Sequence, residues 1–291
     1  MAKSKKRTAF PGGSPTPSPD PATRKHAAGD RRPIRWDLIV LFLAISLGGT
    51  FLAILLRPKN GGERFTYQKI QTYPHDSQAF TQGLVYEDGY LWESTGLKGR
   101  SSVRQVELET GKVVKQTDLD KQYFGEGLTL LNDQLFQLTW QEHQAFVYDR
   151  ELNQIKSFDY DSEGWGLTTN GKELIFSDGT SIIQFLDPET FQTRRSIKVR
   201  RGGFRVGKLN ELEYAGGKIF ANVYQTDLIY EIDPSSGDVT SVIDLTGLWP
   251  SQDRPEGGIL NGIAFHTGKK RLLVTGKLCP YIYELELLPA K

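Results

Sequence analysis

A short phrase recurs five times along the chain and organises its pattern of hydrophobic and polar positions. Each copy has three residues: a polar or aromatic residue, then Gly, and then Leu or Ile. In one copy Glu stands in place of Gly. The copies start 44, 39, 45 and 51 residues apart, at Gln82, Glu126, Trp165, Asn210 and Asn261. A turn signal and then a short apolar run follow each phrase, which is typical of β-strands. We call the segment that begins with each phrase a unit.

Each unit holds further apolar runs at similar spacing. The second runs include 90–92, 134–136, 173–175, 218–220 and 271–273, and the third runs are 103–108, 145–149, 182–187, 228–233 and 281–286. Four of the third runs lead through a tight turn into a fourth strand, as at 109–114 and 234–243. Four strands with a period of about 40–50 residues are typical of a propeller blade. We therefore predict an all-β, five-bladed β-propeller.

The fifth unit ends before its fourth strand. The extended stretch 65–73, FTYQKIQTY, precedes the first phrase and is the obvious donor of that strand. Its pairing with the last unit would close the ring and remove an exposed sheet edge. The alternative is a β-sandwich with chance Gly-Leu pairs, which explains neither the spacing nor the missing strand.

The repeat also predicts where side chains gather. In a propeller the first strand of each blade lines the channel and begins at one mouth, so the residues before Gly form a ring: Gln82, Glu126, Trp165, Asn210 and Asn261. The ends of the second strands form a neighbouring ring of Gly96, Trp140, Gly179, Tyr224 and Lys277. Equivalent positions that differ in chemistry indicate a binding or catalytic pocket at this mouth.

Glu126 is the only acid in the two rings. Apolar walls around it would favour its protonated form, and a carboxyl tuned in this way is suited to general acid–base catalysis. Lys277 is suited to polarising a carbonyl or stabilising an oxyanion. The alternative for these two residues is a structural ion pair. Amides and an aromatic box complete the predicted pocket: Gln82, Asn210, Phe80, Trp140, Trp165 and Tyr224.

The N-terminal part differs in composition from the rest. Residues 1–37 are rich in Lys, Arg, Pro, Ser and Gly, and we predict a disordered basic tail. Residues 38–56 carry no charge and are long enough to span a hydrocarbon layer of roughly 30 Å. We predict a single-pass transmembrane anchor at 38–56, a linker at 57–64 and the propeller at 65–291. The alternatives for 38–56 are a buried core helix and, with Arg31 and Arg32, a twin-arginine export signal.

Basic residues are more frequent before this apolar segment than after it, which predicts a cytoplasmic N-terminus and an extracytoplasmic or periplasmic catalytic domain. The net charge is +1 for the whole chain. Because the tail is strongly basic, the body is mildly acidic, and this argues against a nucleic-acid-binding surface. The lone Cys279 excludes an intrachain disulfide and a Cys-based zinc site.

Other chemistries find little support in the sequence. The four His residues show no metal-ligand spacing, and no nucleophile elbow or P-loop is present. The scattered acids are expected to cap turns; they are Asp161, Glu163, Asp178 and Asp187. A basic stretch at 194–205 is expected to be a solvated loop between the third and fourth units, or a dock for an acidic partner.

Several phrases together resemble the plant-type glutaminyl-peptide cyclotransferases, also called glutamine cyclotransferases. They are FTQGL (80–84), YFGEGLT (123–129), QLTW (137–140), GWGLT (164–168), LNELEY (209–214), ANVYQTDLIYEID (221–233), LNGIAF (260–265) and TGK (275–277). The resemblance covers about residues 65–288. It implies a five-bladed propeller and an acyltransferase that converts the N-terminal glutamine of peptides or proteins to pyroglutamate with loss of ammonia. It also implies that neither a metal nor another cofactor takes part.

The resemblance assigns roles to individual positions of this sequence. Glu126 matches the proton-transferring glutamate, Asn210 the substrate-binding asparagine and Lys277 the lysine near the reacting amide. Further pocket residues are matched by Phe80, Gln82, Phe124, Trp140 and Trp165. Tyr224 stands where the family often has Trp, and this departure keeps the aromatic wall.

Two other classes of function compete with this hypothesis. One is a non-catalytic, membrane-tethered binding module that uses the same pocket, although a mere binder would tolerate loss of Glu126 and Lys277. The other is a lactonase-like metal hydrolase, which lacks the required cluster of channel-facing carboxylates.

Overall fold

The computed structural model describes residues 61–290. The predicted tail, the predicted membrane-spanning segment 38–56 and the first half of the predicted linker, residues 57–60, lie outside this range. Within 61–290 no helix has the length and apolarity needed to cross a membrane. The single helical element there is the short 3-10 turn η1 (Ser251–Asp253), and the rest is β-strand, turn and loop.

Strands in sequence order form most of the sheets. The first unit is the sheet β2 (Thr81–Glu87), β3 (Tyr90–Thr95), β4 (Ser102–Glu107) and β5 (Val113–Asp118). The second is β6 (Gly125–Leu131), β7 (Gln134–Thr139), β8 (Gln144–Tyr148) and β9 (Gln154–Asp159). The third is β10 (Leu167–Thr169), β11 (Leu174–Ser177), β12 (Ile182–Leu186) and β13 (Thr193–Lys198). All three are antiparallel meanders.

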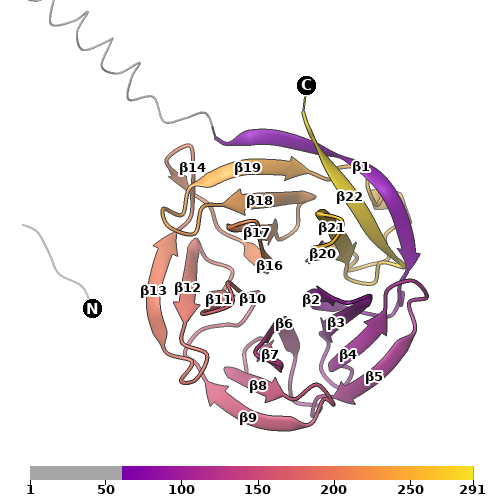
Figure 1. Cartoon of the computed structure of the whole chain (residues 1–291), viewed down its shortest axis with the longest axis vertical. Coiled ribbons are helices and arrows are strands. Elements are labelled where there is room, and N and C mark those ends of the chain that lie inside the picture. The colour runs from indigo at the N-terminus through magenta and orange to yellow at the C-terminus, as the bar shows by residue number, and fades with distance from the viewer. Residues whose placement is uncertain (1–60, 291) are drawn as a thin grey trace, which may run out of the picture. The chain divides into compact units, whose positions relative to one another are not determined.

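The remaining long strands form one eight-stranded sheet in the order β16-β17-β18-β19-β1-β22-β21-β20. Its members are β16 (Leu209–Ala215), β17 (Lys218–Val223), β18 (Leu228–Ile232), β19 (Val239–Asp244), β1 (Glu63–Pro74), β22 (Tyr281–Pro289), β21 (Arg271–Gly276) and β20 (Leu260–His266). A two-stranded hairpin, β14 (Arg200–Arg201) and β15 (Phe204–Arg205), follows β13. In Figure 1 the sheets surround a centre, with β2, β6, β10, β16 and β20 innermost.

The prediction of five separate blades is wrong. The expected strand at 65–73 lies within β1, which pairs antiparallel with β22, but β1 also pairs in parallel with β19, in the register Glu63↔Ser241 to Phe65↔Ile243. This second pairing merges the fourth and fifth units into one sheet. The described residues therefore form one eight-stranded sheet, three four-stranded sheets and a hairpin.

The expected solvated loop at 194–205 is also mostly strand. Arg194 and Arg195 lie in β13 and form ion pairs with Asp187 at 2.6 Å and Glu173 at 3.2 Å. Two of the acids expected to cap turns do so, since Asp178 accepts the N–H of Thr180 and Asp187 that of Glu189.

The glycines of the repeated phrase are required by the close approach of neighbouring inner strands. A Cβ atom added at Gly83 would lie 2.3 Å from the N of Leu128, and one at Gly127 would lie 2.5 Å from the N of Leu167. At Gly166 it would lie 2.0 Å from the carbonyl O of Asn210. These are backbone atoms of the next unit, so no side chain can move aside.

Gly166→Ala is therefore expected to lower the free energy of unfolding by about 3 kcal/mol, the upper end of the usual cost of overpacking. For a domain of this size that is a fall in melting temperature of roughly 6–12 °C. The control is Gly268→Ala, where the new Cβ would meet its nearest neighbour at 3.5 Å. Equal melting temperatures for the two variants would contradict the steric argument.

The fourth unit has Glu211 where the other units have Gly. Its carboxyl group links inner strands through hydrogen bonds to their backbone. Its oxygens accept the backbone N–H of Leu84 on β2 at 3.2 Å and of Ile263 on β20 at 2.8 Å. Glu213 accepts the N–H of Phe265 at 3.0 Å. Burial raises the pKa of both carboxyls, that of Glu213 to about 8. The inner strands are thus linked by the buried Glu211 and the half-buried Glu213.

The raised pKa of Glu213 predicts that the fold loses stability as the pH rises. A carboxyl whose pKa is higher in the folded than in the unfolded chain stabilises fully below its unfolded value, near 4.3, and this contribution is lost up to about pH 8. The slope per group is at most about 1.4 kcal/mol per pH unit. We expect Glu213→Gln to flatten the decline in unfolding free energy measured with urea between pH 5 and 8. The exposed Glu286 on β22 provides the control variant Glu286→Gln, which should keep the wild-type slope.

A buried polar network joins the first unit to the last. His75, which follows β1, contacts Oε1 of Glu93 on β3 through Nε2 at 3.0 Å, and its Nδ1 lies 2.7 Å from the carbonyl O of Cys279. Arg104 on β4 donates from Nε to the other oxygen of Glu93 at 2.8 Å. The Glu93 carboxylate raises the pKa of His75 against the opposing effect of burial. The network holds the segment 75–80 against the loop that follows β21.

Candidate active site

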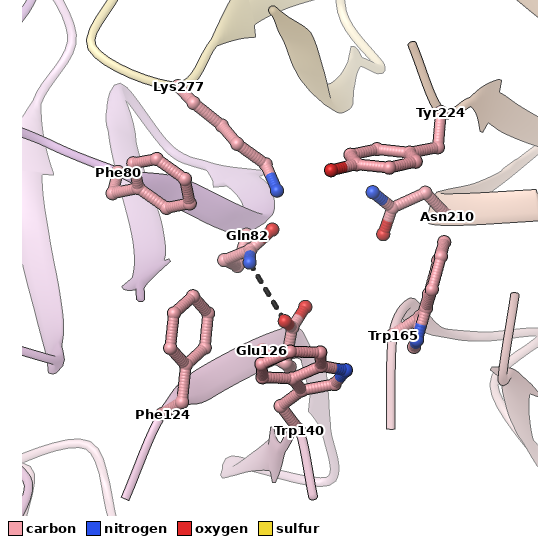
Figure 2. Close-up of a pocket in the computed structure, with 9 residues that line it drawn as sticks. All are labelled: Phe80, Gln82, Phe124, Glu126, Trp140, Trp165, Asn210, Tyr224 and Lys277. Atoms are coloured by element: carbon pink, nitrogen blue, oxygen red, sulfur yellow. Dashed lines mark hydrogen bonds between the residues drawn. The ribbon is translucent and has the colours of Figure 1, made fainter. Parts of the chain in front are cut away.

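Nine of the ten predicted site residues line one cavity of about 320 Å³ (Figure 2). They are Phe80, Gln82, Phe124, Glu126, Trp140, Trp165, Asn210, Tyr224 and Lys277. The volume is at the small end of ligand pockets, which run from about 300 to 1,000 Å³. The cavity thus suits a small group such as one amino-acid side chain.

The repeat places these side chains because equivalent positions meet at one mouth. Gln82, Glu126 and Asn210 lie near the beginnings of inner strands, and Trp165 stands just before β10. Trp140, Tyr224 and Lys277 directly follow β7, β17 and β21. Backbone hydrogen bonds to the segments before the inner strands fix these three strand ends. The N–H of Trp140 donates to the O of Phe124 at 3.0 Å, and the N–H of Lys277 donates to the O of Ile259 at 2.9 Å.

Two glycines at strand ends make room for pocket aromatics. A Cβ at Gly96 would lie 2.4 Å from Cε1 of Phe124, and a Cβ at Gly179 would lie 2.7 Å from the Trp165 ring. Gly therefore follows the second strands of the first and third units because a neighbouring ring occupies the space that a side chain would need.

Aromatic rings form most of the cavity wall. Phe124 packs edge-on against Phe80 and Trp140, with ring centroids 6.1 Å and 5.6 Å apart. On the other side Trp165 packs against Tyr224 at 5.4 Å. Figure 2 shows these rings around a central space into which Lys277 and Glu126 point from opposite sides.

Glu126 is buried, with 5% of its surface exposed. Its Oε1 accepts a hydrogen bond from Nε2 of Gln82 at 2.8 Å. Burial raises the pKa of Glu126 well above its ordinary value; Lys277 opposes this shift, and the Glu163 and Glu142 carboxylates add to it. A carboxyl whose pKa is raised in this way holds a proton more readily than an ordinary carboxyl, which suits it to accept a proton and return it.

Lys277 is equally buried and is surrounded by rings. Its Nζ lies 4.8 Å from the centroid of Phe80 and 5.3 Å from that of Tyr224. Burial lowers the pKa of Lys277, and Glu126 opposes this shift. Glu126 and Lys277 form no direct ion pair, since no N–O distance between them is 4.0 Å or less, although each affects the pKa of the other. The gap between them leaves room for a reacting group.

Asn261 is the predicted site residue that does not line the cavity. Its Nδ2 donates to the carbonyl O of Thr81 at 3.0 Å and to Oε1 of Gln82 at 3.1 Å. The Thr81 carbonyl only accepts hydrogen bonds, so it must face the NH2 group of the Asn261 amide. That NH2 group also donates to Oε1 of Gln82, which leaves Nε2 of Gln82 directed to Glu126. Asn261 thus acts behind the pocket, and its assignment as a substrate-binding residue is not supported by this placement.

Asn210 supplies a free acceptor in the cavity. Its Oδ1 is buried and has no hydrogen-bond partner among the described residues. A buried acceptor without a partner is costly, and a ligand N–H would satisfy it.

Glu163 is a further residue of the site that the repeat does not predict. It was expected to cap a turn, yet its carboxylate accepts the indole N–H of both Trp140 and Trp165, each at 2.9 Å. The feature of the sequence that points to this role is the position of Glu163 two residues before Trp165, which the repeat places at the mouth. Within residues 61–290 no group of three or more His, Cys, Asp or Glu side chains is arranged to hold a metal ion.

Comparisons with known proteins agree on one family. The family model described as glutamine cyclotransferase matches residues 42–287. A glutaminyl-peptide cyclotransferase from Arabidopsis thaliana is 46% identical over 228 residues, which are 76% of this chain and 71% of the relative.

A solved structure gives the same result. The crystal structure of a glutaminyl cyclase from Myxococcus xanthus superimposes with a TM-score of 0.74 at 35% identity and covers 79% of this chain and 100% of its own. The match of the family model to most of the sequence and these two relatives show that the chain belongs to the glutamine cyclotransferase family.

Proposed function

We propose that the cavity around Glu126 carries out the glutaminyl-peptide cyclotransferase reaction of the family with side chains alone as acid, base and oxyanion partner. The activity itself, that of an acyltransferase acting on N-terminal glutamine, follows from family membership. The residue roles rest on one observation: a buried carboxyl of raised pKa faces a buried amine across a cavity of side-chain size.

The substrate contains both reactants. Its α-amino nitrogen attacks Cδ of its own side-chain amide, so a C–N bond forms and, after a tetrahedral intermediate, the bond from Cδ to the amide nitrogen breaks. Glu126 takes a proton from the attacking amine and delivers it to the departing nitrogen, which leaves as ammonia. The intermediate carries negative charge on oxygen, and the Lys277 ammonium stabilises it.

The walls supply geometry. An extended glutamine side chain must fold back on itself to bring its amine and amide carbon to about 3–3.5 Å. The rings of Phe80, Phe124, Trp140 and Trp165 bound the space in which it folds. The Oδ1 of Asn210 accepts an N–H of the bound glutamine, and the peptide that follows leaves through the mouth.

The direct test is ammonia release by the purified chain from a Gln-initiated dipeptide amide, with loss of the substrate's primary amine followed in parallel. We expect turnover that persists after exhaustive dialysis against a chelator. Turnover lost on chelation and restored by Zn²⁺ would overturn the metal-independent part of the proposal. Absence of turnover with every Gln-initiated peptide would overturn the proposal as a whole.

A further inference from the structure

Glu163 lies in the segment that connects β9, at the outer edge of one sheet, to β10 at the centre of the next. One of its oxygens, Oε2, is 2.9 Å from Nε1 of Trp140 and 2.9 Å from Nε1 of Trp165. The other, Oε1, accepts the Nε2 of Gln141 at 2.8 Å. A single carboxylate therefore receives three donors, two of them from walls of the cavity.

This arrangement joins two sheets through their pocket aromatics. Trp140 follows β7 in the second unit, and Trp165 precedes β10 in the third. An indole N–H is a donor only and has one direction, so its bond to a fixed acceptor sets the rotation of the whole ring. In Figure 2 the nitrogen edges of the two indoles are turned toward each other. Sharing one oxygen fixes the angle between the two walls.

Charge strengthens the contact. A hydrogen bond to an ionised carboxylate is roughly twice as strong as one between neutral groups. The donors hold Glu163 in its charged form, since the hydrogen bond from Gln141 and those from both indoles lower its pKa. His143 also lowers the pKa of Glu163, and the Glu163 carboxylate in turn raises the pKa of Glu126, together with that of Glu142.

We propose that Glu163 is a positioning residue for cyclisation, which holds Trp140 and Trp165 at a fixed angle so that the glutamine side chain is bent into its reactive shape. The inference rests on the proposed function but concerns a residue that does not line the cavity. It acts through the two rings. We call the contact of Glu163 with Trp140 and Trp165 the clamp. Its loss frees both rings at once, and a shift of about 1 Å in a reacting group costs roughly 10²-fold in rate.

Two substitutions separate geometry from charge. Glu163→Ala removes the acceptor, and we expect kcat/KM to fall by about 10- to 100-fold, with a higher KM as well as a lower kcat. Glu163→Gln keeps one carbonyl oxygen that can accept both indoles, and we expect kcat/KM within about fivefold of wild type. Glu142→Gln is the matched control, because Glu142 also lies near Glu126 but accepts the backbone N–H of Phe124 rather than an indole.

A readout without turnover tests the clamp directly. In ¹⁵N–¹H spectra of the full chain, with the indole signals assigned from Trp140→Phe and Trp165→Phe, we expect both signals to move together on acidification, with one midpoint. In Glu163→Ala neither signal should show this titration. Movement of only one signal, or independent midpoints, would overturn the clamp even in an active enzyme.

The kinetic and spectroscopic results distinguish the two proposals. A chain without cyclotransferase turnover whose indoles still titrate together refutes the proposed function and leaves the clamp intact. An active chain in which Glu163→Ala matches Glu142→Gln in KM and kcat refutes the positioning role. If Glu163→Ala does not fold, Glu163→Gln and the wild-type titration still decide the clamp.

Discussion

Glu126→Gln is expected to lower kcat by about 10³-fold, within the range of 10²–10⁴ that general acid–base catalysis contributes. The glutamine amide keeps the shape and the hydrogen bond from Gln82 but accepts no proton at neutral pH. KM for a Gln-initiated peptide should change little, because the cavity walls are unaltered. Steady-state ammonia release over a series of substrate concentrations measures both constants.

The stability of this variant serves as its control. The pKa of Glu126 is raised in the fold, so its contribution to stability is present at low pH and lost as the pH rises through that pKa. Gln does not ionise, so at pH 8 the variant should melt at or above the wild-type temperature. A kcat within tenfold of wild type would remove Glu126 from the mechanism.

Lys277→Met should lower kcat by about 10²–10³-fold, the cost of losing one group that stabilises an oxyanion. Met fills the space of the lysine stem between Phe80 and Tyr224 without a charge. Because Lys277 opposes the raised pKa of Glu126, its removal should also move the acidic limb of the pH profile of kcat to higher pH. Rates measured from pH 5 to 9 with one substrate show both effects.

Two further observations make this prediction specific to charge. The pKa of Lys277 is lowered by burial, so the charged lysine disfavours folding and Met should not reduce the melting temperature at pH 7. Lys277→Arg keeps the charge and should leave the acidic limb closer to that of wild type. A loss of rate with an unmoved limb in Lys277→Met would show that the lysine acts through shape alone.

The sequence predicts most of the site because the site follows a local rule. Residues before Gly-Leu and at the ends of second strands occupy equivalent places in every unit, so counting along the repeat brings Glu126 and Lys277 together although 150 residues separate them. The strands themselves follow from short runs of alternating apolar positions between turn signals. The glycines were predicted as repeat markers, and the structure adds the steric reason.

What the sequence does not show depends on contacts between units. The parallel pairing of β1 with β19 has no pattern of its own, because any extended strand with free edges satisfies the same alternation. Asn261 obeys the repeat but lies behind Gln82, and only the position of the Thr81 carbonyl reveals this. Glu163 lies in a connecting segment outside the repeat, so its contact with two indoles follows from the path of the chain in space.

The double pairing of β1 has a consequence for synthesis of the protein. β1 is made before every other described strand, and its partners β19 and β22 are among the last. Contacts of such long sequence separation form late in folding. While the chain is still on the ribosome, the first three sheets can assemble, but β1 stays without either of its partner strands until β19 and β22 have been made. A nascent chain therefore carries Glu126 long before Lys277, and the eight-stranded sheet that contains β21 is completed only after β22 has been made.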